Sequence, residues 1–194
     1  MELHYSTKIP GGDGNRPVFR REKSMGFLEN LFGKKEKEKT AGRVIYSPLK
    51  GNVVPLSEVG DPVFSEGMMG PGVGIVPEEG KLYSPVDGEI TVAFHTGHAV
   101  GLKTSDNMEV LIHIGIDTVK MNGDGFKVHM KEGDKVKAGD LLISFDMEKI
   151  IASGYKTTTM VVVSNAEEFG TMSGEASGNV KVGDKLFVIG QGEN

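Results

Sequence analysis

Thr96-Gly97-His98-Ala99-Val100 is followed, after the polar turn Thr104-Ser105-Asp106-Asn107, by Leu111-Ile112-His113-Ile114-Gly115-Ile116-Asp117-Thr118. The two runs are typical of β-strands and each carries one histidine, so the stretch predicts a β-hairpin. If the turn is centred between Ser105 and Asp106, His98 lies directly opposite His113. Directly opposed residues of an antiparallel pair share one face of the sheet. The sequence therefore predicts two imidazoles side by side.

The second run alternates between β-branched residues and other residues, which assigns its two faces. The core-facing set is Val110, Ile112, Ile114 and Ile116, and the other set is Leu111, His113, Gly115 and Asp117. On the first strand, the residues expected to share the His113 face are Thr96, His98, Val100 and Leu102. Val100 and Leu111 then give the histidines apolar neighbours. A slip of one residue in register would remove this arrangement.

The neighbourhood of the two histidines favours a functional role. Thr96 falls opposite Gly115 in this register; the glycine leaves open space beside His113, and the threonine hydroxyl can fix an imidazole tautomer. Such a pair can transfer a group through a nucleophilic imidazole, act as a general base, or bind a metal ion. We assign no role to the other histidines, which are His4, His95 and His129.

Glycine-rich turns and short apolar runs predict an all-β fold. The chain of 194 residues has 28 glycines and 8 prolines, and its strand-like runs are short and punctuated by Gly-Asp and Asp-Gly. The only helical segments expected inside the body are brief, around Met147–Ala152 and Glu167–Phe169. This pattern favours a compact antiparallel β-sandwich or barrel with very short helices.

Two pairs of segments repeat within the body of the chain. Tyr46–Val53 resembles Tyr83–Ile90, and Val136–Leu141 resembles Val180–Lys185. The repeats are too few and too unequal for a solenoid or a propeller. They indicate a duplicated β architecture built from related hairpin units, of the barrel-sandwich hybrid type.

The composition excludes several classes of protein. The chain lacks cysteine and has no apolar run long enough to span a membrane, so we expect a cytoplasmic protein. Residues 41–194 carry most of the acidic excess of a chain with net charge −5, which argues against nucleic-acid binding. Gly97–Thr104 and Gly70–Gly74 lack the spacing of phosphate-binding loops.

The first 40 residues differ from the rest of the chain. Residues 1–24 lack periodic apolar residues, so residues 1–40 are expected to form a disordered leader plus a short amphipathic helix at about 26–33. That segment is either a frayed, solvated tail or a site of weak contact with a membrane or a partner through residues 26–35. Residues 41–194 are expected to form a single domain, with the motifs concentrated in 61–165. Met25-Gly26 and the short helix favour a free-standing protein.

The chain resembles the glucose-type enzyme IIA family of the bacterial phosphoenolpyruvate-dependent sugar phosphotransferase system. The resemblance extends over nearly all of Gly26–Gly190 and is most specific between His113 and Phe126. The motifs that carry it are Met25-Gly26-Phe27-Leu28, Ser47-Pro48-Leu49-Lys50-Gly51, Asp61-Pro62-Val63-Phe64-Ser65, Thr96-Gly97-His98-Ala99, His113-Ile114-Gly115-Ile116-Asp117-Thr118-Val119 and Asn122-Gly123-Asp124-Gly125-Phe126. The resemblance implies an antiparallel β-sandwich with a shallow, apolar active-site depression.

The same resemblance implies a role for each residue of the pair. His113 matches the histidine that is phosphorylated on Nε2, and His98 matches the second histidine, which contacts the phosphoryl group and supports its transfer. Thr96 matches the threonine that orients the pair. Asp61 and Asp117 match acidic residues that flank the site. A phosphoryl group brings about −1.5 to −2 charges, so it needs hydrogen-bond donors and requires the Asp117 carboxylate to lie to one side.

The family relays phosphate between proteins for sugar uptake. The resemblance implies a phosphotransferase that accepts phosphate from phosphohistidine on the carrier protein HPr and passes it to a sugar-specific IIB domain, with the IIC domain in the membrane. It implies no required cofactor. In some members, the two positions matched by His98 and His113 also bind zinc when a regulated partner donates a further ligand, so regulated enzymes or transporters are further expected partners.

Two other classes of protein share features with this chain. A zinc peptidase of the lysostaphin type has a related β architecture and clustered histidines, but it needs a His-x-His pair, and position 115 is glycine. A biotinyl or lipoyl carrier would explain the Val-Lys-x-Gly-Asp repeats and would carry its cofactor on Lys149. The flanks of Lys149 fit neither modification motif well.

Overall fold

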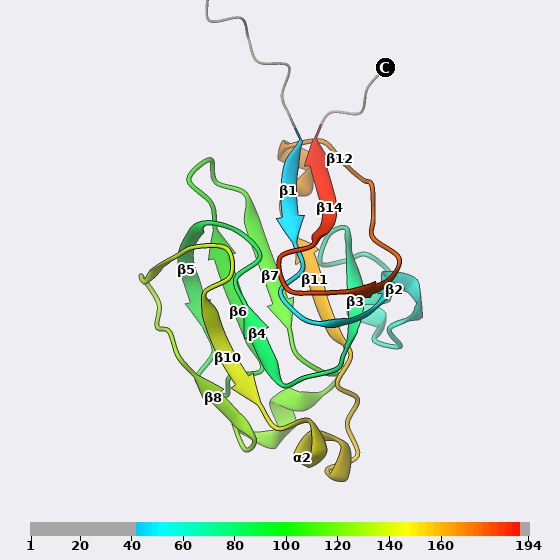
Figure 1. The fold of residues 1–194 in the computed structure, drawn as a ribbon, viewed down its shortest axis with the longest axis vertical. Coiled ribbons are helices and arrows are strands. Elements are labelled where there is room, and N and C mark those ends of the chain that lie inside the picture. The colour runs from blue at the N-terminus through cyan, green and yellow to red at the C-terminus, as the bar shows by residue number, and fades with distance from the viewer. Residues whose placement is uncertain (1–41, 191–194) are drawn as a thin grey trace, which may run out of the picture. The chain divides into compact units, whose positions relative to one another are not determined.

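A computed structural model describes residues 42–190 of the chain (Figure 1). The leader expected at 1–24, the helix expected at 26–33 and the membrane contact expected at 26–35 all lie outside the described residues. In the described part, no helix has the length and hydrophobicity needed to cross a membrane.

Antiparallel strands form three sheets, which confirms the predicted all-β class. The largest has eight strands, in spatial order β13 (Gly178–Val180), β2 (Gly51–Pro55), β3 (Gly72–Pro77), β11 (Thr159–Val163), β7 (Glu109–His113), β6 (Ala99–Lys103), β5 (Gly88–Ala93) and β9 (Lys135–Val136). One small sheet consists of β1 (Arg43–Tyr46), β14 (Lys185–Gly190) and β12 (Thr171–Ser173). The other consists of β4 (Lys81–Tyr83), β10 (Leu141–Phe145) and β8 (Phe126–Val128).

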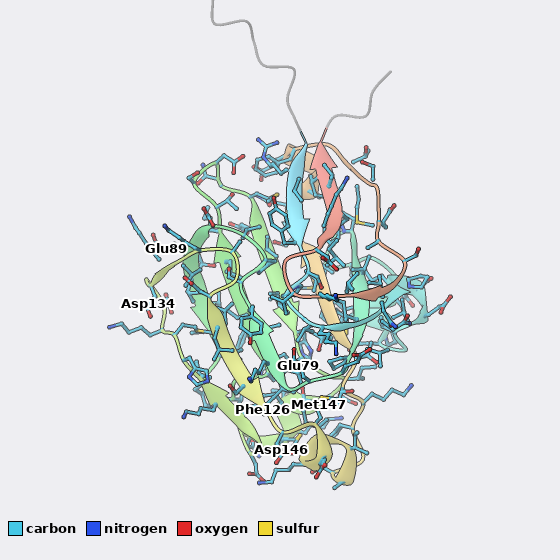
Figure 2. All side chains as sticks on the ribbon, viewed as in Figure 1. Glu79, Glu89, Phe126, Asp134, Asp146 and Met147 are labelled. Carbon is cyan, nitrogen blue, oxygen red and sulfur yellow. The ribbon has the colours of Figure 1, made fainter. Side chains whose placement is uncertain are left out.

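Helices are few and short. The α-helices are α1 (Pro62–Ser65) and α2 (Met147–Ala152), and the 3-10 turns are η1 (Leu56–Glu58), η2 (Thr118–Met121) and η3 (Ala166–Glu168). The helix expected at Met147–Ala152 is therefore confirmed, whereas the one expected at Glu167–Phe169 is a 3-10 turn one residue earlier. Asp146, labelled beside Met147 and Phe126 in Figure 2, caps α2 by accepting a hydrogen bond from the Lys149 amide.

The core lies between the large sheet and the small ones. Strands β6 and β7 contribute fully buried residues such as Leu102 and Ile112, and these belong to the same cluster as Leu82 of β4 and Ile143 of β10. The β4–β10–β8 sheet therefore packs against the inner face of the β6–β7 region (Figure 1). His113 lies on the opposite, outer face of β7.

The first repeated pair of segments is joined by reciprocal hydrogen bonds. The Tyr46 amide donates to the Pro85 carbonyl over 3.1 Å, and the Tyr83 amide donates to the Pro48 carbonyl over 2.9 Å. Each segment thus bonds the other through the same positions of the repeat. This reciprocity is what a two-fold relation between duplicated units produces.

The second repeated pair follows the same two-fold relation. The Ser47 amide donates to the Asp184 carbonyl over 2.7 Å, and the Ser84 amide donates to the Asp140 carbonyl over 2.8 Å. Each copy of the first repeat therefore contacts one copy of the second. The two repeats seen in the sequence belong to a single duplicated framework.

The register of the β6–β7 hairpin differs by one residue from the prediction. His113 lies opposite Ala99, and Lys103 lies opposite Glu109. The turn has five residues, Thr104–Met108, and the Thr104 amide donates to the Met108 carbonyl over 2.9 Å. Asn107 adopts a positive φ of 70° there, and the turn has one residue more than the predicted four-residue turn Thr104–Asn107.

The register correction changes which residues share a face. Val100 and Leu102 lie opposite Ile112 and Val110, and both are completely buried in the main core. They do not share the His113 face, so the predicted apolar contact between Val100 and the histidines is wrong. The alternation predicted for β7 itself is confirmed, because Ile112 and Ile114 are buried and His113 is half-buried.

Candidate functional site

The rings of His98 and His113 lie side by side, with their centroids 5.0 Å apart and their planes at 75°. His113 ends β7, and His98 immediately precedes β6. The predicted proximity of the two imidazoles is therefore confirmed, although the register from which it was derived is wrong.

A turn before β6 explains why the rings still meet. In a regular strand with this register, His98 would be opposite Ile114 and would face away from His113. Instead His98 follows Gly97, whose φ is +65°, and this breaks the alternation. A Cβ on Gly97 would lie 2.8 Å from the Phe126 Cβ, so both the backbone conformation and the space require glycine.

His113 is oriented by the backbone of Gly115. Its Nδ1 lies 2.8 Å from the Gly115 carbonyl oxygen. Because a carbonyl can only accept, Nδ1 donates and carries the proton, which leaves the lone pair of the neutral ring on Nε2. Gly115 has a φ of +74°, and a Cβ there would lie 2.4 Å from the Thr118 Cγ2 and 2.7 Å from the Lys156 carbonyl oxygen.

His98 is oriented by a side chain instead. The Thr96 Oγ1 lies 2.5 Å from the His98 Nδ1, and both residues are 6% exposed. Thr96 belongs to the turn before β6 and has no strand partner, so its predicted position opposite Gly115 is not a ladder pair. A hydroxyl can donate or accept, and the contact is compatible with either tautomer of His98.

Burial keeps both imidazoles neutral near pH 7. Burial, the neighbouring His113 and, to a smaller extent, His95 lower the pKa of His98 to about 4. Burial also lowers the pKa of His113, opposed by its hydrogen bond to Gly115 and by the negative charges of Asp61 and Asp117. Both carboxylates are thus close enough to act on the His113 ring.

The two acidic residues are placed by short helical segments. Asp61 caps α1, and its Oδ1 accepts a hydrogen bond from the Val63 amide over 3.0 Å. Asp117 precedes η2 with a φ of +61° and forms an ion pair with Lys120 over 3.0 Å. The capping role was not predicted, although Asp61-Pro62 is a typical helix start.

Two aromatic residues in contact with the histidines were not predicted. The Phe64 ring lies 5.4 Å from the His113 ring, and the Phe94 ring lies 5.1 Å from the His98 ring. Phe64 is buried, whereas Phe94 is 41% exposed. Their contacts arise from α1 and from the turn before β6, neither of which strand periodicity describes.

The surface around the pair is apolar in part. Val63 on α1 and Val119 on η2 are both more than 40% exposed. Leu111, expected as an apolar neighbour, is half-buried and packs against the cluster that contains Phe64 and Met160. Elements that carry the flanking acids therefore also present apolar side chains to solvent.

The pair alone does not complete a metal site. Within residues 42–190, no group of three or more His, Cys, Asp or Glu side chains is arranged to hold a metal ion. His98 and His113 offer two imidazole nitrogens, whereas a structural zinc ion takes four ligands. Lys149 lies in α2 with its Nζ 2.6 Å from Asp124, and not at the hairpin tip that a biotinyl or lipoyl carrier requires.

Comparisons with known proteins agree on one family. Residues 43–169 match the family model described as phosphoenolpyruvate-dependent sugar phosphotransferase system, EIIA 1. The PTS system glucose-specific EIIA component of Halalkalibacterium halodurans is 44% identical over 166 residues, which cover 83% of this chain and 96% of that protein. The solved structure of glucose permease IIA from Mycoplasma capricolum is 32% identical, with a TM-score of 0.71, over 75% of this chain and 94% of that one.

One relative is much longer than this chain. The PTS system beta-glucoside-specific EIIBCA component of Bacillus subtilis is 48% identical over 146 residues, or 75% of this chain. The match covers 24% of that protein. The chain therefore spans about a quarter of this relative and nearly all of the EIIA relative.

Proposed function

This chain belongs to the EIIA 1 family of the phosphoenolpyruvate-dependent sugar phosphotransferase system, in which it is a phosphoryl-relay component, and we propose that it carries the phosphoryl group on Nε2 of His113. The observation that supports this most directly is the hydrogen bond from the His113 Nδ1 to the Gly115 carbonyl. Together with the lowered pKa, that bond leaves a lone pair on Nε2.

The proposed transfer exchanges one phosphorus–nitrogen bond for another. Nε2 of His113 attacks the phosphorus of the phosphohistidine on the donor, and the new bond forms as the donor's bond breaks. The electron pair of the broken bond stays on the donor imidazole. The His113 Nδ1 keeps its proton, and the Gly115 carbonyl stabilises the positive charge that develops on the ring. Catalysis of this kind consists of alignment and charge stabilisation.

His98 supports the phosphoryl group in this proposal. If the Thr96 hydroxyl donates to the His98 Nδ1, the proton of the neutral His98 ring sits on Nε2, where it can be donated to a phosphoryl oxygen. The ring distance of 5.0 Å places this donor beside His113. Thr96 is then a positioning residue that acts through His98.

Asp61 and Asp117 have a different role. A carboxylate against the phosphoryl group would repel it, so we assign both residues to the flanks of the site. Asp61 holds α1, and thereby Phe64, against the His113 ring. Asp117 is paired with Lys120 and is exposed, so a docking partner can contact it.

The proposed donor is HPr and the proposed acceptor is a sugar-specific IIB domain. This assignment follows from the family and implies a cytoplasmic location, where both partners would meet the protein. The fused EIIBCA relative supports the pairing with IIB and IIC, since it contains an EIIA-like part. The relay needs no cofactor. A zinc ion shared with a regulated partner would take Nε2 of His98 and of His113 as two ligands, with the others supplied by the partner.

The test is phosphorylation from phosphoenolpyruvate with enzyme I and HPr. We expect wild-type protein to acquire acid-labile phosphate, His113→Gln to acquire none, and His98→Gln to accept phosphate but fail to pass it to a IIB domain. His129→Gln is a matched control, because His129 is exposed and bonded to Ser144 in the β8–β10 sheet. Stable labelling of His113→Gln would refute the assignment.

A further inference from the structure

Phosphorylation of His113 would bring about −1.5 to −2 charges to a site that already has two nearby carboxylates. Asp61 and Asp117 both act on the His113 ring. Lys120 neutralises Asp117 through its ion pair, but Asp61 has no lysine or arginine within 4.0 Å in the described part of the chain. A further cation at the site would offset the charge of the phosphoryl group.

Lys156 is the cation that the fold brings to this place. Its carbonyl oxygen accepts a hydrogen bond from the Ile116 amide over 3.0 Å, which fixes its backbone beside the Gly115 loop. Its side chain extends to the other flank of the site, where Nζ lies 3.6 Å from the position that a Cβ on Gly60 would take. Gly60 immediately precedes Asp61. The lysine thus connects the loop that orients His113 with the turn that begins α1.

Among residues 42–190, the ammonium group of Lys156 forms no ion pair. Lys120 and Lys149 each hold a carboxylate at 3.0 Å or less, whereas no carboxylate lies within 4.0 Å of the Lys156 Nζ among residues 42–190. Lys156 is exposed, and its flexible four-carbon stem allows the ammonium to move without a change in the backbone.

We propose that Lys156 is a phosphoryl ligand: its ammonium moves from the Gly60 turn to bind an oxygen of the phosphoryl group carried by His113. This inference rests on the proposed function and deepens it. The contact is an ion pair with a charge-assisted hydrogen bond, and no bond to phosphorus is made or broken. Lys156 would balance the charge of the intermediate, while Lys120 stays with Asp117.

The experiment compares isolated phosphoproteins. Wild type, Lys156→Gln, Lys156→Arg and the control Lys131→Gln are phosphorylated with phosphoenolpyruvate, enzyme I and HPr, and the phosphoryl group is then titrated by ³¹P NMR. Lys131 is an exposed lysine in the loop between β8 and β9. We expect Lys156→Gln to raise the pKa of the phosphoryl group and to lower the phosphorylated fraction at equilibrium with HPr about three- to tenfold. Lys156→Arg and Lys131→Gln should behave as wild type.

Two further measurements distinguish the possible results: the salt dependence of the effect and the identity of the phosphorylated residue. The effect of Lys156→Gln should shrink in 1 M salt, since an exposed ion pair is screened. An unchanged titration in Lys156→Gln would overturn the inference, as would a weaker interaction with HPr without a pKa change, which would assign Lys156 to a carboxylate of the partner. Phosphate on a residue other than His113 would overturn the proposed function as well, whereas phosphate on His113 with an unchanged titration would overturn only the role of Lys156.

Discussion

The two ends of the β6–β7 hairpin are built in opposite ways. At the turn end, Lys103 faces Glu109 with an ion pair of 3.3 Å, and local hydrogen bonds close Thr104–Met108. At the open end, His98 and His113 converge, held by contacts that depend on two glycines with positive φ. The turn end is largely exposed and is closed by bonds between neighbouring residues, with Arg43 and Asn165 joining it from distant segments. At the open end, aromatic rings from separate elements pack against the histidine pair.

The cavity and the histidine pair lie at opposite ends of the hairpin. A cavity of about 540 Å³ lies at the turn end, lined in part by Lys103, Thr104 and Asn107. Its polar side chains are exposed or half-buried. The convergent and buried polar groups lie at the open end, at the histidine pair. Buried titratable groups with lowered pKa values therefore identify the site better than the cavity does.

The largest effect is expected from a residue with positive φ at the open end. Gly115→Ala introduces strain in the left-handed region and forces a Cβ against Thr118 and the Lys156 carbonyl. We expect a loss of about 2–4 kcal/mol of unfolding free energy in urea titrations, together with slower phosphorylation, because the Gly115 carbonyl orients His113.

Asn107→Gly is the matched variant at the turn end, where φ is +70°. Glycine tolerates this conformation, so we expect a change within about 0.5 kcal/mol and unaltered phosphorylation. Equal effects of the two substitutions would contradict the contrast between the ends.

The same contrast explains what the sequence could predict. The alternation along β7 depends on neighbouring residues, and it placed His113 correctly. The register depends on the length of the turn, and a centre between Ser105 and Asp106 put it wrong by one residue. The prediction also assumed that His98 continues the regular alternation of the strand. The two errors cancelled, because the turn at Gly97 rotates His98 back toward His113.

Contacts that come from separate elements could not be read from periodicity. Phe64 reaches His113 from α1, and Phe94 reaches His98 from the turn before β6. The difference between the histidines was predicted only from the family resemblance. Its physical basis is their partners: a backbone carbonyl for His113 and a hydroxyl for His98.

The pH dependence of stability should differ between the ends. The pKa of His98 is about 4 in the folded protein and near 6.5 when unfolded, so only the unfolded state gains a proton between these values. Stability should fall as the pH drops from 6.5 to 4, by at most on the order of 3 kcal/mol for His98. Denaturation at several pH values, with His98→Gln as reference, isolates this contribution.

At the turn end, the stability should depend on pH in a lower pH range. Hydrogen bonds from Thr104 and Arg43 lower the pKa of Asp106, so its stabilising contribution is present above about pH 4 and is lost below that value. Asp106→Asn should therefore lower the stability by a constant amount above about pH 4 and change its pH dependence only below that value. If His98→Gln left the profile between pH 4 and 6.5 unchanged, the buried and neutral state of His98 would be refuted.

A smaller effect is expected from the two threonines of the hairpin. Thr96→Val removes the hydrogen bond to the His98 Nδ1, and Thr104→Val removes bonds to Asp106 and to the Met108 amide. Each should cost about 1 kcal/mol in urea denaturation. Only Thr96→Val should also slow transfer of phosphate to a IIB domain, because it removes the hydrogen bond that selects the tautomer of His98. Slower transfer in both variants would indicate a general loss of structure.

A small effect is also expected where Arg43 joins β1 to the turn. Its guanidinium pairs with Asp106 and lies 4.4 Å from the centre of the Phe169 ring. Both partners of the ion pair are partly exposed, so Arg43→Gln should cost less than about 1 kcal/mol, and the cost should decrease in high salt. Phosphorylation of His113 should be unchanged, since Arg43 acts on the turn end. A slower phosphorylation in Arg43→Gln would mean that the turn influences the histidines through β6 and β7, and that the two ends are not independent.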